Sequence, residues 1–173
     1  MTILDLIKED HDGAMEIIKR LEKMTEKPSK RAWDLTKELV EEVLLHAKTE
    51  EKVLYSAMKA KNISFRDFTL EGEIEHKLLE SCLMGLLKVR PGEDGKYKAA
   101  LSVVKELLEH HGKEEEEKEL FPKLRKSYKR AELEEMGVEF KAMKKEIRPK
   151  IMLKLSGPRL KGASVNSAKQ ILH

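Results

Sequence analysis

The histidines of this chain are spaced so that they can meet inside a helical bundle. If four helices run up, down, up and down, turns near residues 27, 63 and 93 bring one histidine of each helix to nearly the same height. Histidines scattered over a surface have no reason to be spaced in this way. Four imidazoles at one level of a bundle core could bind metal ions. The histidines concerned are His11, His46, His76 and the adjacent pair His110 and His111.

Two of these histidines are followed four residues later by a glutamate. Glu50 follows His46 and Glu115 follows His111, and this spacing puts both side chains of a pair on one helix face. The face around Glu50 also carries valines, so an unpaired ionised carboxylate would be costly to desolvate there and a cation would remove that cost. Imidazole together with carboxylate suits iron, manganese or zinc. The single cysteine argues against a structural zinc or an iron–sulfur centre.

The composition is typical of an all-helical protein. Charged residues make up 39% of the 173-residue chain and aromatic residues 5%, with few glycines and prolines. The net charge is +3 with basic and acidic residues interleaved, so we expect no nucleic-acid partner. No apolar run approaches the length of a membrane span, and the first residues lack the pattern of a signal peptide. With Cys82 as the only cysteine, a reducing cytoplasm is the expected location.

The spacing of apolar residues predicts four long helices, over about residues 3–24, 31–61, 65–88 and 96–128. Short connections favour antiparallel neighbours, so we predict an all-α fold, an up-down-up-down four-helix bundle, over residues 1–130. An additional helix is expected over residues 131–148. Residues 149–173 are basic, lack acids and contain Gly-Pro and serine breaks. We expect them to form a loosely ordered tail that could contact a protein partner.

The chain resembles the hemerythrin-like family of histidine-histidine-glutamate cation-binding domains over about residues 3–128. The resemblance rests on motifs in all four predicted helices: Asp10-His11; His46-x-x-x-Glu50-Glu51 with Leu54-Tyr55; Glu75-His76-Lys77; and His110-His111-x-x-Glu114-Glu115 leading to Leu120-Phe121-Pro122. It implies a non-haem di-iron centre in the bundle core, oxo- and carboxylate-bridged. The metal ligands that it implies are His11, His46, Glu50, His76, His111 and Glu115.

One departure from the family pattern concerns the third helix. Oxygen-carrying hemerythrins have a second histidine four residues after the first, where this chain has Glu80. The pattern is instead similar to that of the four-histidine, two-glutamate di-iron proteins linked to nitric oxide defence and the repair of iron centres. The resemblance therefore implies reversible oxygen carriage less strongly.

The ligand register of the fourth helix has two interpretations. His111 stands one residue farther from Leu-Phe-Pro than its counterpart in the second helix stands from Leu-Tyr. A π-bulge could absorb the extra residue, and we therefore expect His111 with Glu115. A straight α-helix would instead favour His110 with Glu114, because these two line up with apolar residues of the helix. The sequence leaves this alternative open.

These features predict a protein that binds or reacts with a small diatomic ligand, O2 or nitric oxide, at an open iron position in the bundle core. One alternative is an iron- or oxygen-sensing module in which metal occupancy controls partner binding through the basic tail. Another is a metal-free bundle with hydrogen-bonded core histidines. No general acid, base or nucleophile separate from the expected ligands can be identified, so the sequence does not decide whether the protein is an enzyme.

Overall fold

Helices form almost all of the structure. The computed structural model describes residues 1–61, 65–93 and 95–156. No strand occurs within these ranges, so the prediction of an all-α fold is confirmed. The elements in chain order are α1 (Ile3–Glu22), α2 (Lys30–Glu50), the π-helix η1 (Glu51–Tyr55), α3 (Ser56–Lys61), α4 (Arg66–Leu86), α5 (Lys96–Leu108), the π-helix η3 (Glu109–Leu120), α6 (Phe121–Ser127) and α7 (Arg130–Leu155).

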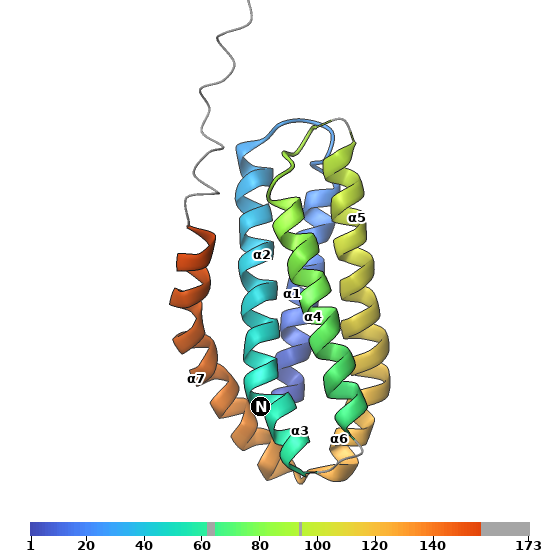
Figure 1. Cartoon of the computed structure of the whole chain (residues 1–173), viewed down its shortest axis with the longest axis vertical. Helices are drawn as coiled ribbons and strands as arrows, with labels where there is room; N and C mark the ends of the chain where they lie inside the picture. Colours follow the sequence, from blue (N-terminus) through green and yellow to red (C-terminus); the bar gives the residue numbers. More distant parts are fainter. Residues whose placement is uncertain (62–64, 94, 157–173) are drawn as a thin grey trace, which may run out of the picture.

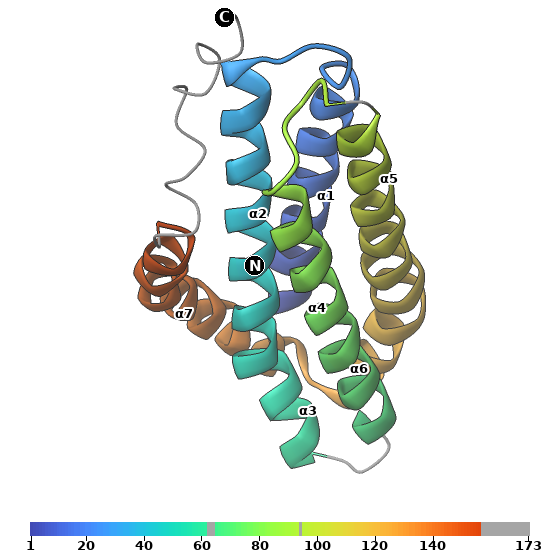
Figure 2. The same cartoon turned by 45° about the horizontal axis from the view of Figure 1, so that its top comes forward.

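Four long rods make up the bundle (Figures 1 and 2). The second rod is α2 continued by η1 and α3, and the fourth is α5 continued by η3 and α6. Each rod contacts two others: α1 packs on α2 and α5, and α4 packs on the same two helices. This is the predicted up-down-up-down bundle, and α7 lies outside it against α2 and α1.

The ends of the first two helices are fixed by local hydrogen bonds. The Thr2 hydroxyl accepts from the backbone N–H of Asp5, and the Asp5 carboxylate accepts from the backbone N–H of Thr2, a capping box that starts α1. The Ser29 hydroxyl accepts from the N–H of Ala32 and starts α2. Both helices therefore begin where the sequence predicts.

The apolar core is divided into two clusters. One is built around Leu39, Leu83 and Val104, and the other around Leu54 and Phe121. In every rod the histidines predicted to meet fall between the segments that supply these clusters. A layer of polar side chains therefore crosses the bundle between two apolar layers.

The additional helix is longer than the sequence predicts. It was expected to end near residue 148, but α7 continues through Pro149 to Leu155. Ile147 and Ile151, one turn apart on the same face, are buried in the core on either side of the proline. Their burial offsets the hydrogen bond that a proline removes from a helix. The rest of the predicted tail, residues 157–173, lies outside the described residues, as does any partner contact through it.

None of the helices in the described ranges is long and apolar enough to cross a lipid bilayer.

Candidate metal centre

The π-helix η3 decides which side chains of the fourth rod enter the polar layer. In a π-helix, hydrogen bonds run from residue i to i+5, so residues five apart share a face, whereas in an α-helix residues four apart do so. In α2, which is α-helical, His46 shares a face with Glu50, as predicted. In η3, His111 shares a face with Glu116. Both side chains are buried, with 5% and 2% of their surface exposed.

The predicted partner of His111 is therefore displaced by one residue. Glu115 lies half-buried on the neighbouring face, where its carboxylate is 3.0 Å from His110 Nε2. The prediction of Glu115 assumed α-helical spacing. It anticipated a π-bulge, but not a π-helix over the whole Glu109–Leu120 segment. In that π-helix the residue that shares a face with His111 stands five positions after it, and not four.

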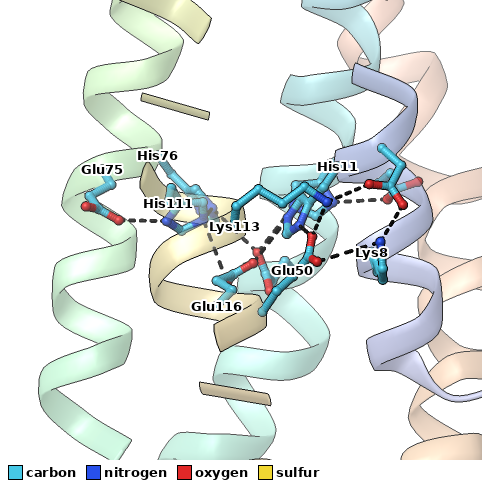
Figure 3. Close-up of polar contacts among 12 residues, drawn as sticks. Lys8, His11, Glu50, Glu75, His76, His111, Lys113 and Glu116 are labelled. Atoms are coloured by element: carbon cyan, nitrogen blue, oxygen red, sulfur yellow. Dashed lines mark hydrogen bonds and ion pairs between the residues drawn. The ribbon is translucent and has the colours of Figure 1, made fainter. Parts of the chain in front are cut away.

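Six buried histidines and glutamates of the four rods form the polar layer, and Figure 3 shows His11, Glu50, His76, His111 and Glu116 turned toward one another. All are buried, and none is more than 6% exposed. Five of the six residues expected from the sequence are among them, and Glu116 is the sixth. They are His11 from α1, His46 and Glu50 from α2, His76 from α4, and His111 and Glu116 from η3.

The two glutamates lie between the histidines. Glu116 Oε2 is 3.2 Å from His11 Nε2, and Glu116 Oε1 is 3.7 Å from His111 Nε2. Glu50 Oε2 is 3.5 Å from His46 Nε2 and 3.6 Å from His76 Nε2. Each carboxylate thus faces one histidine from each side of the layer. The donor atoms form two groups that could each hold a cation, namely His11, His46 and Glu116, and Glu50, His76 and His111.

The outer nitrogen of every one of these histidines contacts a carboxylate from a different rod. Such a carboxylate fixes the ring and keeps the proton on Nδ1, so that the lone pair of Nε2 faces inward. Each of the four carboxylates directly follows or precedes an inward-facing residue of its own rod, so the contacts close a ring around the bundle. The pairs are Asp10 with His46 at 3.0 Å, Glu51 with His76 at 3.1 Å, Glu75 with His111 at 2.6 Å and Glu117 with His11 at 3.1 Å.

Three of these outer carboxylates also contact lysines. Lys144 of α7 lies 2.6 Å from Asp10, Lys48 lies 3.2 Å from Glu51, and Lys113 lies 2.8 Å from Glu117. Glu75 instead lies beside His110 and Glu115, the other partners on the outer face of η3. Burial would raise the pKa values of these three carboxyls, but the histidines, and with them the lysines, hold them below their usual values.

Sequence analysis did not assign a role to these outer carboxylates. The signal was available, because an acidic residue adjoins an inward-facing residue in each rod, as in Asp10-His11, Glu50-Glu51, Glu75-His76 and Glu116-Glu117. In an acid-rich sequence this adjacency is common. Only the packing of the rods shows that each acid serves the histidine of another rod.

Tyr55 borders the polar layer on the side of the apolar cluster that contains Leu54 and Phe121. Its ring stacks on His76 with an interplanar angle of 3°, and its hydroxyl donates to Glu116 Oε1 at 3.3 Å. Gly72 on α4 makes this possible, because a Cβ at that position would lie 2.2 Å from the tyrosine oxygen. Gly112 likewise leaves room for the ring of His11, which would lie 3.0 Å from an added Cβ.

The arrangement of donors fits a metal. Within the described residues, five buried atoms of this layer have no hydrogen-bond partner: Nε2 of His11 and of His46, both carboxylate oxygens of Glu50, and Glu116 Oε2. In addition, His76 Nε2 and His111 Nε2 face each other at 3.0 Å. With both Nδ1 atoms donating outward, two lone pairs meet there unless a proton or a cation lies between them. Burying nitrogen and oxygen lone pairs without a partner costs free energy, and bound cations would remove that cost.

The pKa values of the buried glutamates and of His11 also indicate that these ligand groups lack a positive partner. Burial and the neighbouring Glu116 carboxylate raise the pKa of Glu50 well above its usual value. Burial would lower the pKa of His11, but Glu116 and Glu117 outweigh it and raise that pKa to about 9. Burial would likewise raise the pKa of Glu116, but His111 and His11 hold it far below its usual value. Without a cation, a raised pKa favours the protonated form of His11 and the neutral form of Glu50.

The other residues considered in the sequence lie outside the layer. His110 is 56% exposed and its Nδ1 is 3.4 Å from the carboxylate of Glu114, which is also exposed. The alternative pairing of these two is thus a surface contact. Glu80 pairs with Lys154 of α7 and lies 4.0 Å from Lys48. It provides no donor to the layer.

The α7 helix covers one side of the layer. The Phe140 ring lies edge-on to that of His46, with 6.4 Å between ring centroids, and Lys144 holds Asp10. The sequence alone did not reveal a role for this helix. The packing shows that it buries and supports the histidine of α2.

The family comparison agrees with this arrangement. Residues 2–124 match the family model described as the hemerythrin HHE cation-binding domain, so the chain belongs to this family of cation-binding helical bundles. The matched range covers the first three rods, the fourth as far as residue 124, and every residue of the polar layer. Searches of curated proteins and of solved structures each returned no match.

Proposed function

We propose that the protein holds a non-haem di-iron centre in the polar layer and binds or reacts with O2 or nitric oxide there. The observation that carries this proposal is the position of Glu50 and Glu116, each of which faces one histidine from each of the two donor groups. A carboxylate in that position is suited to bridging two cations. The metal ligands proposed are His11, His46, Glu50, His76, His111 and Glu116.

The donor set supports two metals better than one. Four imidazoles spread over two groups leave two for each metal, and two bridging carboxylates supply one oxygen to each. That count leaves positions on each metal for an oxygen bridge and for a small ligand. Mixed imidazole and carboxylate ligation suits iron, which supplies redox chemistry that no side chain of the layer can provide.

The chain's own residues control the surroundings of that centre. The outer carboxylates orient the histidines, and the two apolar clusters exclude water above and below the layer. A pocket of about 330 Å³ between α1 and α2 reaches His11 and His46 from the surface, lined also by Val43 and Leu108. It is a route by which a small molecule can approach, and glutamates of both helices lie along it.

The direct test is elemental analysis of freshly purified protein with absorption spectra before and after reduction and exposure to O2 and to nitric oxide. We expect about two irons per chain and near-ultraviolet bands of an oxo-bridged pair that respond to at least one gas. A Glu50→Ala variant is expected to lose most of the iron, whereas Glu80→Ala, outside the layer, keeps it. No metal after anaerobic Fe(II) loading, or full iron in Glu50→Ala, would contradict the proposal.

A further inference from the structure

One of the four outer carboxylates differs from the others in its surroundings. The other three each contact a lysine. Among the residues that the structure describes, neither a lysine nor an arginine pairs with Glu75. Its neighbours on the outer face of the bundle are His110 and Glu115 of η3. Two acids and a histidine therefore lie together at the position where the other outer carboxylates have a cationic side chain.

The three side chains of this outer cluster converge on one point. His110 Nε2 lies 3.0 Å from Glu115 Oε1 and 3.8 Å from Glu75 Oε1. One donor atom from each residue lies within 4.8 Å of the other two. Two ligands that hold the same ion at about 2.1 Å stand roughly 3.0–3.4 Å apart. Small side-chain movements would therefore bring all three donors onto one cation.

The two oxygens of Glu75 have different partners. Oε2 accepts a hydrogen bond from His111 Nδ1 at 2.6 Å, and Figure 3 shows Glu75 reaching this ring from outside the layer. Oε1 is the oxygen that faces His110. An ion could therefore bind Oε1 while Oε2 continues to orient the histidine of the polar layer.

His110 is oriented much as the buried histidines are. Its Nδ1 is 3.4 Å from the carboxylate of Glu114. A proton on Nδ1 leaves the lone pair of Nε2 facing the other two members of the cluster. Glu115 stands five residues after His110, which is also the spacing of the buried histidine and glutamate of η3. The π-helix thus places one histidine–glutamate pair in the layer and a second pair on the adjoining outer face.

We propose that Glu75, His110 and Glu115 bind a divalent transition-metal ion at the surface of the bundle, separately from any metal in the polar layer. One imidazole with two carboxylates suits Fe(II), Mn(II) or Zn(II). His110 is 56% exposed, so water can reach the ion and complete its coordination. The ion supplies the positive charge that a lysine supplies beside each of the other outer carboxylates.

Calorimetric titration of the full-length protein with Zn(II), after iron loading and desalting, tests the site. We expect the wild type to bind one Zn(II) more per chain than His110→Ala does. Glu115→Gln should bind that ion at least about tenfold more weakly than the wild type. All of these proteins have the same polar layer, so the difference between them is read in the same way whether or not the layer holds iron.

Glu119→Gln is the matched control for this titration. Glu119 is an exposed acid of the same π-helix but lies outside the cluster, so the variant should bind Zn(II) as the wild type does. Circular dichroism and iron content verify that each variant is folded with its layer unchanged. Equal Zn(II) binding by the wild type and His110→Ala would overturn the proposal and leave the cluster as an ion pair of His110 with its acidic neighbours.

Anomalous X-ray scattering locates the ion independently. Crystals of the full-length protein are soaked in Zn(II) and measured on both sides of the zinc absorption edge, which distinguishes zinc from iron. We expect a zinc peak about 2.0–2.1 Å from His110 Nε2 and about 2.0–2.2 Å from one oxygen each of Glu75 and Glu115. Zinc bound elsewhere, with none at this cluster, would contradict the assignment.

Discussion

Two adjacent glutamates of η3 differ in their surroundings, and this difference can be tested. Glu116 is 2% exposed and faces two histidines, whereas Glu115 is half-buried beside His110. We expect Glu116→Gln to weaken metal binding at least about a hundredfold, because it removes a charged bridging donor, while Glu115→Gln changes it less than about threefold. Competition of each variant with a chelator of known affinity measures this. Equal losses in both variants would show that the register has been misassigned.

The metal ligands His11 and Glu50 must lose their protons when metal binds. Glu116 and Glu117 raise the pKa of His11 to about 9 against the effect of burial, so His11 carries a proton at pH 7 without metal, and burial and Glu116 raise the pKa of Glu50, so we expect a proton there as well. Loading should release about two protons per chain. Because the pKa of His11 is raised, metal affinity should increase as pH rises from 7 to 9.

The release of protons on metal loading can be followed with an indicator dye in weakly buffered solution. A Glu50→Gln variant has no carboxyl proton to lose and should release about one proton fewer. Glu80→Gln should release as many as the wild type. A proton count that is independent of Glu50 would mean that this carboxyl is already ionised in the metal-free protein.

At the residue scale, most of the candidate site could be predicted from the sequence. The common height of the histidines and the His46–Glu50 spacing require only helix geometry, and the structure brings those side chains together. The choice between Glu115 and Glu116 depends on hydrogen-bond register within a helix. Sequence spacing does not reveal that register, because the same residues can form either an α- or a π-helix.

At the element scale, close approach of rods depends on Gly72, as it does on Gly112 beside His11. Gly72 admits Tyr55, which is 2% exposed and stacks on His76. Gly72→Ala would place a Cβ 2.2 Å from the tyrosine oxygen, so we expect a loss of about 2 kcal/mol in the free energy of unfolding. Urea unfolding of the metal-free protein measures it.

A matched control lies on α1. Gly13 is also within a helix, but an added Cβ would meet nothing within 4 Å. Gly13→Ala should therefore stabilise the protein by up to about 1 kcal/mol through helix propensity. Combining Gly72→Ala with Tyr55→Ala should cost less than the sum of the two single changes. Full additivity would show that the glycine and the tyrosine do not compete for space.

The helices themselves were largely predictable, and α7 shows where prediction ends. Apolar periodicity located all four rods of the bundle to within a few residues. Pro149 and the basic composition after it indicated the end of the fifth helix, yet α7 continues to Leu155. The burial of Ile147 and Ile151 decides this, and such burial depends on the packing of α7 against α1 and α2 in the assembled bundle.

At the scale of the whole molecule, metal should stabilise the fold. The polar layer joins all four rods, and its buried donors lack partners without a cation. Metal at a hundredfold excess over its Kd should add about 2.7 kcal/mol to the free energy of unfolding, or roughly 5–10 °C to Tm for a domain of this size. Thermal unfolding followed by circular dichroism, with and without Fe(II) under anaerobic conditions, measures this.

The Glu116→Gln variant is the control for this effect. It keeps the bundle and most of the layer, but lacks one of the two carboxylates that face both donor groups. Its gain in Tm on adding metal should be much smaller than that of the wild type. A similar gain in both proteins would indicate that metal stabilises the fold from another site.

The closed ring of histidine–carboxylate contacts also bears on how such a domain can be inherited. Asp10, Glu51, Glu75 and Glu117 each hold the histidine of the next rod, and the last of them returns to the first rod. A recombination event in any loop of the bundle therefore separates two of the four pairs, and Glu117 with His11 is always one of them. Chimaeras of distant relatives would need both interrupted pairs to match, so exchange of single rods is disfavoured and the four are expected to descend together.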